Sequence, residues 1–98
     1  MSVSAIDINI TKVENSRINE LDPANIQFGR CYSDHMLIAY YDNGVWGQPE
    51  IMPFHNIPFS PATTFFHYGQ AIFEGVKAYK DPQGNPQIFR PYDNWKRM

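Results

Sequence analysis

The chain has 98 residues, which allows one domain near the lower size limit for an independent hydrophobic core. Hydrophobic residues make up 43% and charged residues 18%, so the chain is too apolar for a disordered tail and a core is expected. The formal net charge is -2 and the lysines and arginines are scattered, which argues against a nucleic-acid partner.

Cysteine and histidine usage predicts neither a disulfide nor a metal site. Cys31 is the single cysteine, and His35, His55 and His67 lie too far apart for a metal-ligand motif. Each histidine is therefore expected to be a hydrogen-bonding or surface imidazole. The sequence shows no secretory leader and no membrane-spanning run. We expect a cytoplasmic protein without a membrane partner.

The first half of the chain predicts strands joined by turns. Apolar residues alternate from Ile6 to Ile10, as in a half-buried strand, and Leu21 to Asn25 favours a turn or a helical turn. Strand formers run from Asp34 to Tyr41 and are followed by Asn43-Gly44. This pair indicates a hairpin, because both central positions of a tight primed turn need positive φ. The returning strand is expected over Val45 to Ile51.

A proline-rich connection and a helix are predicted next. Three prolines from Pro53 to Pro61 favour a fixed, extended segment. Ser60 is expected to cap a helix that has Pro61 as its first residue. The helix should run to Tyr68, pause at Gly69 and make a second turn through Phe73. Glu74-Gly75 then ends the helical pattern, because glycine tolerates a left-handed conformation.

The last part of the chain predicts a second hairpin and the start of another helix. Strands are expected over Val76 to Lys80 and Gln87 to Arg90, joined by a turn at Asp81 to Pro86. Asp93 or Asn94 should cap the final helix. We divide the chain into an arm of weak order, residues 1–25, and a domain, residues 26–98, that is truncated at its C-terminal helix.

Arg90 and Arg97 are the candidate anion-binding residues. Guanidinium groups near strand ends and helix starts bind phosphates and carboxylates through planar forks, with help from the helix dipole. The alternative is a surface ion pair of one or both arginines with Asp81 or Asp93. From the residues alone, the surface pair is preferred.

Short motifs follow one another from residue 28 to the end of the chain. They are Phe28-Gly29, Asp34-His35-Met36-Leu37, Trp46-Gly47-Gln48-Pro49, Pro61-Ala62, His67-Tyr68, Phe73 to Lys80, Phe89-Arg90-Pro91 and Arg97-Met98. Their order and spacing resemble the N-terminal part of the branched-chain amino acid aminotransferases, which are class IV, fold-type IV enzymes dependent on pyridoxal 5'-phosphate. The resemblance implies the small α/β domain of that fold, of α+β type, in which an antiparallel sheet has helices packed on one side.

The resemblance also implies roles for particular residues. Arg97 resembles the arginine that grips the cofactor phosphate, which overturns the surface-pair interpretation there, whereas Arg90 keeps it. Phe28 and Phe73 resemble aromatic walls of the pocket for the branched substrate side chain. Tyr68 resembles the tyrosine that reaches across a homodimer interface into the neighbouring active site.

The implied reaction is transamination between leucine, isoleucine or valine and 2-oxoglutarate, in branched-chain amino acid biosynthesis. Family members carry the lysine that binds the cofactor covalently in a larger, later domain. Lys12, Lys77, Lys80 and Lys96 do not match its motif. We therefore expect no catalytic residue, no covalently bound cofactor and no activity in the 98-residue chain alone.

Other interpretations stay open. The chain is alternatively a stand-alone dimerisation or regulatory domain derived from the same fold, which a stop codon directly after Met98 would favour. Another alternative is a relative that acts on D-amino acids or aminodeoxychorismate. The segments Phe28-Gly29 and Asp34-His35-Met36 favour the branched-chain enzymes over those relatives.

Overall fold

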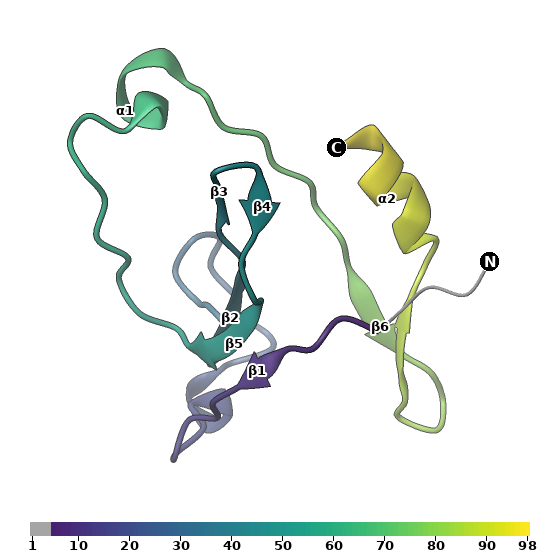
Figure 1. Ribbon diagram of the computed structural model, residues 1–98. Coiled ribbons are helices and arrows are strands. Elements are labelled where there is room, and N and C mark those ends of the chain that lie inside the picture. The colour runs from purple at the N-terminus through teal and green to yellow at the C-terminus, as the bar shows by residue number, and fades with distance from the viewer. Residues whose placement is uncertain (1–4) are drawn as a thin grey trace. The chain divides into compact units, whose positions relative to one another are not determined.

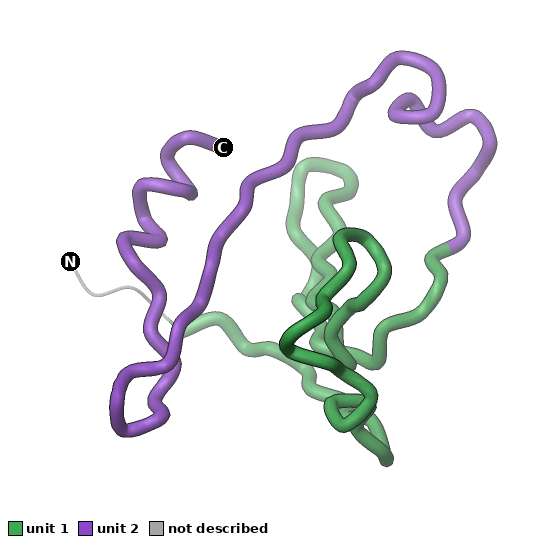
Figure 2. Tube along the Cα trace, turned by 180° about the vertical axis from the view of Figure 1, so that it is seen from behind, with its two compact units in different colours: residues 1–57 green, residues 58–98 purple. Residues whose placement is uncertain are grey.

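The computed structural model describes residues 5–98, which contain short strands, two α-helices and a 3-10 helix at Ile18–Glu20 (Figure 1). The described chain falls into two compact units, Met1–Ile57 and Pro58–Met98 (Figure 2). This mixture of strands and helices confirms the predicted α/β class. Both α-helices belong to the second unit, so the expected packing of helices on one side of a sheet stays a prediction.

The first unit is built on a three-stranded sheet in the order β1-β5-β2. The strands are β1 (Asn9–Ile10), β2 (His35–Ile38) and β5 (Glu50–Pro53). β2 and β5 are antiparallel, and His35 lies opposite Pro53. β1 pairs with β5 in parallel, whereas the other strand pairs among the described residues are antiparallel, as expected. The sheet is therefore mixed, because a long connection rather than a hairpin joins β1 to β5.

The hairpin predicted from Asn43-Gly44 is confirmed. Strands β3 (Tyr41–Asp42) and β4 (Val45–Trp46) are antiparallel, and the two turn residues have φ of 50° and 81°. Both values lie in the region that a primed turn requires. The rings of Tyr41 and Trp46 lie 5.1 Å apart across the pair. Each long strand expected here is divided in two, and the returning one breaks at Gly47 to Pro49, where proline has no N–H to donate.

The first α-helix is shorter than predicted. α1 spans Thr64–Tyr68, so the expected start at Pro61 is wrong. Ser60 instead closes a separate turn, with its carbonyl accepting from the Thr63 N–H at 3.0 Å. The helix ends at Gly69, which has φ of 60°, and the expected second turn through Phe73 is not helical. The left-handed residue reverses the backbone and stops the helix there.

A second hairpin follows α1 in the sequence. β6 (Ala78–Lys80) and β7 (Pro86–Ile88) form the predicted antiparallel hairpin, although both strands are shorter than expected. The Asp81 Oδ1 atom accepts the N–H groups of Gln83 at 2.9 Å and Asn85 at 2.8 Å. Asp81 therefore fixes the connecting turn with its own side chain.

The final helix begins earlier than predicted. α2 spans Pro91–Arg97, and Arg90, with φ of 48°, precedes it. Asp93 and Asn94 lie inside the helix, so the expected cap at either residue is wrong. Pro91 suits the first helical position because its fixed φ is helical and its missing N–H needs no partner there.

The expected hydrophobic core is not found in residues 5–98. None of the residues that the structure describes is buried. Phe28 is fully exposed and Phe73 is 93% exposed. Large apolar side chains that are exposed together mark interaction sites or aggregation hazards.

Among residues 5–98, no helix has the length and hydrophobicity needed to cross a lipid bilayer.

We expect the 98-residue chain, purified by itself, to bind the dye ANS and to self-associate as its concentration rises. Dye fluorescence and sedimentation velocity measure the two effects. The double variant Phe28→Ser, Phe73→Ser should weaken both and leave the far-ultraviolet circular dichroism unchanged, because these exposed rings contribute little packing. A chain that stays monomeric and dye-free at every concentration would contradict the expectation.

Candidate functional site

A forked ion pair joins the segment after α1 to the end of α2. The Arg97 Nε donates to Glu74 Oε2 at 2.9 Å, and Nη2 of the same guanidinium donates to Glu74 Oε1. Two parallel N–H···O bonds between opposite charges are stronger and more directional than a single neutral hydrogen bond. The fork therefore fixes the direction of the guanidinium as well as its position.

Asn94 reinforces the same attachment. Its Nδ2 donates to Glu74 Oε1 at 2.9 Å and to the Gly75 carbonyl at 2.9 Å. Asn94 and Arg97 are three residues apart in α2, so they lie on one face of the helix. One helix face thus holds the backbone and the side chain of the Glu74-Gly75 segment.

The two partners differ in exposure. The Glu74 side chain is 11% exposed, whereas that of Arg97 is 72% exposed. The hydrogen bonds from Arg97, and next those from Asn94, lower the pKa of Glu74 to about 2. The same pairing raises the pKa of Arg97. Glu74 is thus ionised at neutral pH.

Arg97 keeps an open edge for a second anion. A guanidinium has five N–H donors, and Glu74 occupies one on Nε and one on Nη2. No further hydrogen bond of this group is found within the described part of the chain. The outer edge, formed by Nη1 and Nη2, therefore presents parallel donors that match a phosphate or a carboxylate.

The expected help from a helix start is wrong at this position. Arg97 is the last residue of α2, and Pro91 is the first. The C-terminal end of a helix carries partial negative charge, which favours the arginine itself and not an anion bound beside it. Anion binding here depends on the guanidinium alone.

The other predicted site residues lie apart from this ion pair. Tyr68 ends α1 and is 78% exposed, while Phe73 directly precedes Glu74 in the sequence. No hydrogen bond, ion pair or aromatic pair found among the described residues joins Tyr68 to Phe73 or Arg97. Phe28 belongs to the first unit. Phe73 is thus next in sequence to Glu74, the partner of Arg97. The substrate pocket itself stays a prediction.

Arg90 forms the predicted surface pair. Its Nε lies 2.6 Å from Asp93 Oδ2, and both side chains are substantially exposed. Asp93 was one of the two partners expected for it from the sequence, the other being Asp81. Glu74 and Asn94 are the residues that sequence reasoning missed as partners of Arg97.

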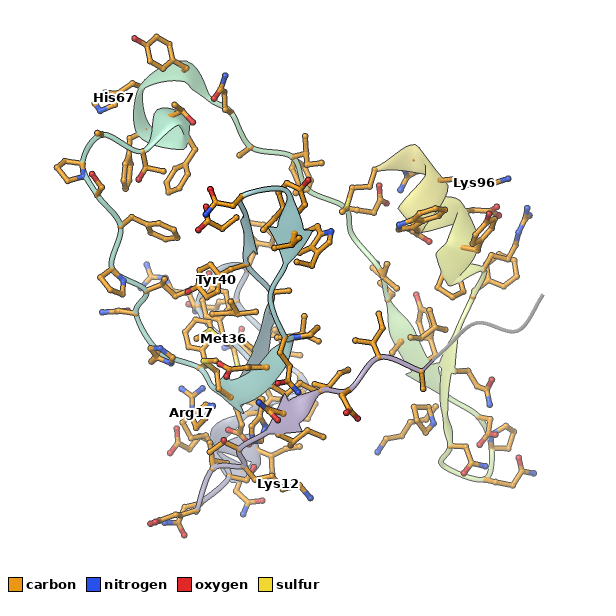
Figure 3. All side chains as sticks on the ribbon, in the orientation of Figure 1. Lys12, Arg17, Met36, Tyr40, His67 and Lys96 are labelled. Carbon is orange, nitrogen blue, oxygen red and sulfur yellow. The ribbon has the colours of Figure 1, made fainter. Side chains whose placement is uncertain are left out.

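In the first unit, Asp34 ties the N-terminal segment to the start of β2. Its carboxylate accepts from Ser16 Oγ at 2.6 Å and from the Arg17 N–H at 3.0 Å, and these bonds, led by that of Ser16, lower the pKa of Asp34. His35 Nε2 accepts from the Val13 N–H at 3.0 Å. Arg17 extends from this segment (Figure 3).

The weak order expected for residues 1–25, of which 1–4 lie outside the described residues, stays a prediction.

A hollow of about 750 Å³ lies beside this attachment. Arg17 and Asp34 line it but are paired with each other at 3.6 Å. Tyr32 and Phe54, which also line it, stack with ring centroids 5.1 Å apart. Arg17 and Asp34 thus use their charges on each other within the unit.

The remaining histidines hold backbone carbonyls, as predicted. His55 Nδ1 lies 2.8 Å from the Pro53 oxygen, and His67 Nε2 lies 2.7 Å from the Pro61 oxygen. His67 projects from α1 (Figure 3). Within residues 5–98, no cluster of side chains is suited to hold a metal ion.

Comparison with known proteins finds branched-chain-amino-acid aminotransferases among the relatives of this chain. The chain is 42% identical over 98 residues to the mitochondrial branched-chain-amino-acid aminotransferase of Schizosaccharomyces pombe, covering 95% of this chain and 22% of that protein. It is 41% identical over 78 residues to the branched-chain-amino-acid transaminase 1 of Bacillus subtilis, covering 79% of this chain and 22% of that protein. The mitochondrial aminotransferase of Mus musculus is 36% identical over 95 residues, with coverages of 96% and 24%.

The chain therefore spans about a quarter or less of the length of these relatives. No protein-family model matches it.

We expect the Glu74 carboxyl to titrate near pH 2, below its ordinary value of 4.5. Because the folded-state pKa is depressed, the pair stabilises the fold fully above about pH 4.5 and is lost as the pH falls toward 2. Carbon-13 NMR of the carboxyl group measures the midpoint. Arg97→Gln should return it toward the ordinary value, whereas the matched variant Arg90→Gln, which breaks the pair with Asp93 and leaves Glu74 untouched, should not.

Proposed function

We propose that this chain, whose predicted resemblance to the branched-chain amino acid aminotransferases the comparisons confirm, is the N-terminal part of a transaminase that uses pyridoxal 5'-phosphate. The intact enzyme exchanges the amino group of leucine, isoleucine or valine with 2-oxoglutarate, in branched-chain amino acid biosynthesis. The names of the relatives favour these substrates over D-amino acids. The chain spans about a quarter or less of those relatives, so the whole activity belongs to a longer parent chain.

The open edge of Arg97 is the observation that carries this proposal. A phosphate monoester offers oxygens at a spacing that parallel N–H groups accept in pairs. The donor set therefore fits the phosphate end of the cofactor. When bound, the cofactor supplies the electron-withdrawing ring that acidifies the α-carbon of an amino acid. In this chain, Arg97 holds the phosphate in place and so orients the ring for partners that lie elsewhere.

Two phenylalanines of this chain form walls of the substrate pocket. Phe28 and Phe73 are nearly or fully exposed in the structure, and each offers a large apolar face to a branched aliphatic side chain. Each substrate methylene contributes only about 1 to 3 kcal/mol of discrimination in such a pocket. The walls therefore separate aliphatic from polar substrates better than they separate leucine from valine.

Tyr68 acts in the neighbouring subunit of a homodimer. It is 78% exposed at the end of α1, where the left-handed Gly69 turns the chain away and leaves the ring projecting. A tyrosine presents an apolar body and a polar tip, which suits a residue at the edge of a pocket. Its hydroxyl would orient the substrate of the partner subunit.

Proton transfer at the substrate is left to a lysine of the parent chain. Lys12, Lys77, Lys80 and Lys96 do not match the motif of that lysine. Lys96 projects from α2 beside the ring of Tyr92 (Figure 3). The proposed location is the cytoplasm, although relatives with mitochondrial and with cytosolic names both occur.

A stand-alone dimerisation or regulatory domain is the second candidate. The exposed rings of Phe28, Tyr68 and Phe73 favour it, because they offer apolar contact area without a core of their own. The reading frame distinguishes the two candidates. Continuation beyond Met98 into a lysine-bearing domain excludes the stand-alone domain, whereas a stop codon there contradicts the transaminase proposal.

The 98-residue chain with pyridoxal 5'-phosphate, leucine and 2-oxoglutarate should form no glutamate, because it lacks the lysine. The full-length parent protein should form glutamate with leucine, isoleucine and valine, and not with lysine. Coupled glutamate assays measure both. Turnover by the 98-residue chain would contradict the proposal that another part of the parent chain supplies the reacting lysine.

Phe28→Ala in the full-length protein should lower kcat/KM for leucine by about 10- to 100-fold, because an apolar wall of the pocket is lost. The expected change lies mainly in KM, measured in steady-state assays. Phe89→Ala removes another exposed phenylalanine, which has no proposed role, and serves as the control. Equal losses in both variants would contradict the assignment of Phe28.

A further inference from the structure

We propose that Glu74 is a positioning residue, which holds Arg97 so that its outer guanidinium edge faces the phosphate group of the bound ligand. This inference rests on the proposed function, because it takes the ligand of Arg97 to be a phosphate. It adds a role for a carboxylate that has the same charge as the ligand and never touches it.

The geometry of the fork supports this role. Glu74 occupies Nε and Nη2, which form the side edge of the guanidinium. The outer edge shares Nη2 with the side edge, and the whole group is planar. Fixing one edge therefore fixes the direction of the other. Without Glu74, an arginine that is 72% exposed has many rotamers of similar energy.

Glu74 is itself held and is largely shielded from water. Asn94 binds both its Oε1 atom and the carbonyl of Gly75, each at 2.9 Å. The Glu74 side chain is 11% exposed. Asn94 and Arg97 come from the same face of α2, and both donate to the Glu74 carboxylate. Because Glu74 is itself held in place, it leaves the Arg97 guanidinium little freedom to rotate.

The competing effect is the charge of Glu74. A carboxylate beside Arg97 reduces the attraction of the pair for another anion, so removal of the charge would strengthen phosphate binding if attraction at a distance dominated. The phosphate, however, makes direct hydrogen bonds with the open edge, and these depend steeply on direction. We therefore expect orientation to outweigh the loss of net charge.

The test uses the full-length protein freed of cofactor, with pyridoxal 5'-phosphate and pyridoxal as probes. The two probes differ only in the phosphate. Glu74→Gln should weaken binding of pyridoxal 5'-phosphate by about 10-fold, as loss of an orienting partner commonly does, and leave binding of pyridoxal nearly unchanged. Equilibrium dialysis gives both dissociation constants, and the pyridoxal value reports whether the variant keeps its fold.

Matched variants separate orientation from general damage. Asp93→Asn removes a carboxylate from the exposed pair on the same helix and should change neither constant. Arg97→Lys should lose the preference for the phosphorylated probe, and adding Glu74→Gln to it should cause no further loss, because the two residues act as a unit. Asn94→Ala, which loosens the anchor, should weaken the phosphate preference as well and decides the question if Glu74→Gln does not fold.

The outcomes separate this inference from the proposed function. Wild-type protein that binds both probes equally contradicts the proposed function itself. Wild-type protein that prefers the phosphorylated probe, with that preference kept or increased in Glu74→Gln, overturns only the role of Glu74. Parallel weakening of both probes in Glu74→Gln also overturns it, since a purely structural role predicts that result.

Discussion

The ion pair between Glu74 and Arg97 is the contact on which the organisation of the second unit depends. α2 has only seven residues, and a helix of that length is not stable in water by itself. The two-stranded β6–β7 hairpin is likewise marginal in isolation. The pair joins the segment before this hairpin to the helix after it, and so ties α2 to the rest of the unit. It does so with a geometry that leaves part of the arginine available for binding.

Features with a local chemical cause were predictable from the sequence. The Asn43-Gly44 hairpin is the clearest example, since its two positive φ angles are those that the residue types favour. The limits of α1 were not predictable in the same way. Ser60 has the chemistry of a helix cap but forms its own turn, and Gly69 ends the helix where only a pause was expected. Local preferences indicate that such residues interrupt regular structure, but not which interruption is used.

The candidate site was predictable only in part, because its contacts join residues far apart in the chain. Arg97 was identified through family resemblance, whereas its partner Glu74 lies 23 positions away, beyond the reach of any spacing rule. The pairing of Arg90 with Asp93 joins residues only three positions apart and was among the alternatives. The prediction of a hydrophobic core was wrong for a related reason. Composition sets how much apolar surface a chain has, but tertiary structure decides which segments cover that surface.

The parallel pairing of β1 with β5 has a consequence for the order of assembly during synthesis. Asn9 and Ile10 leave the ribosome well before their partners Glu50 and Ile51. The β2–β5 ladder closes a shorter loop than the β1–β5 pair and loses less chain entropy, so it forms first. Until β1 adds to it, one side of β5 has unpaired peptide groups that any extended segment can bind. The edge of β5 is thus open to non-native pairing until β1 is in place.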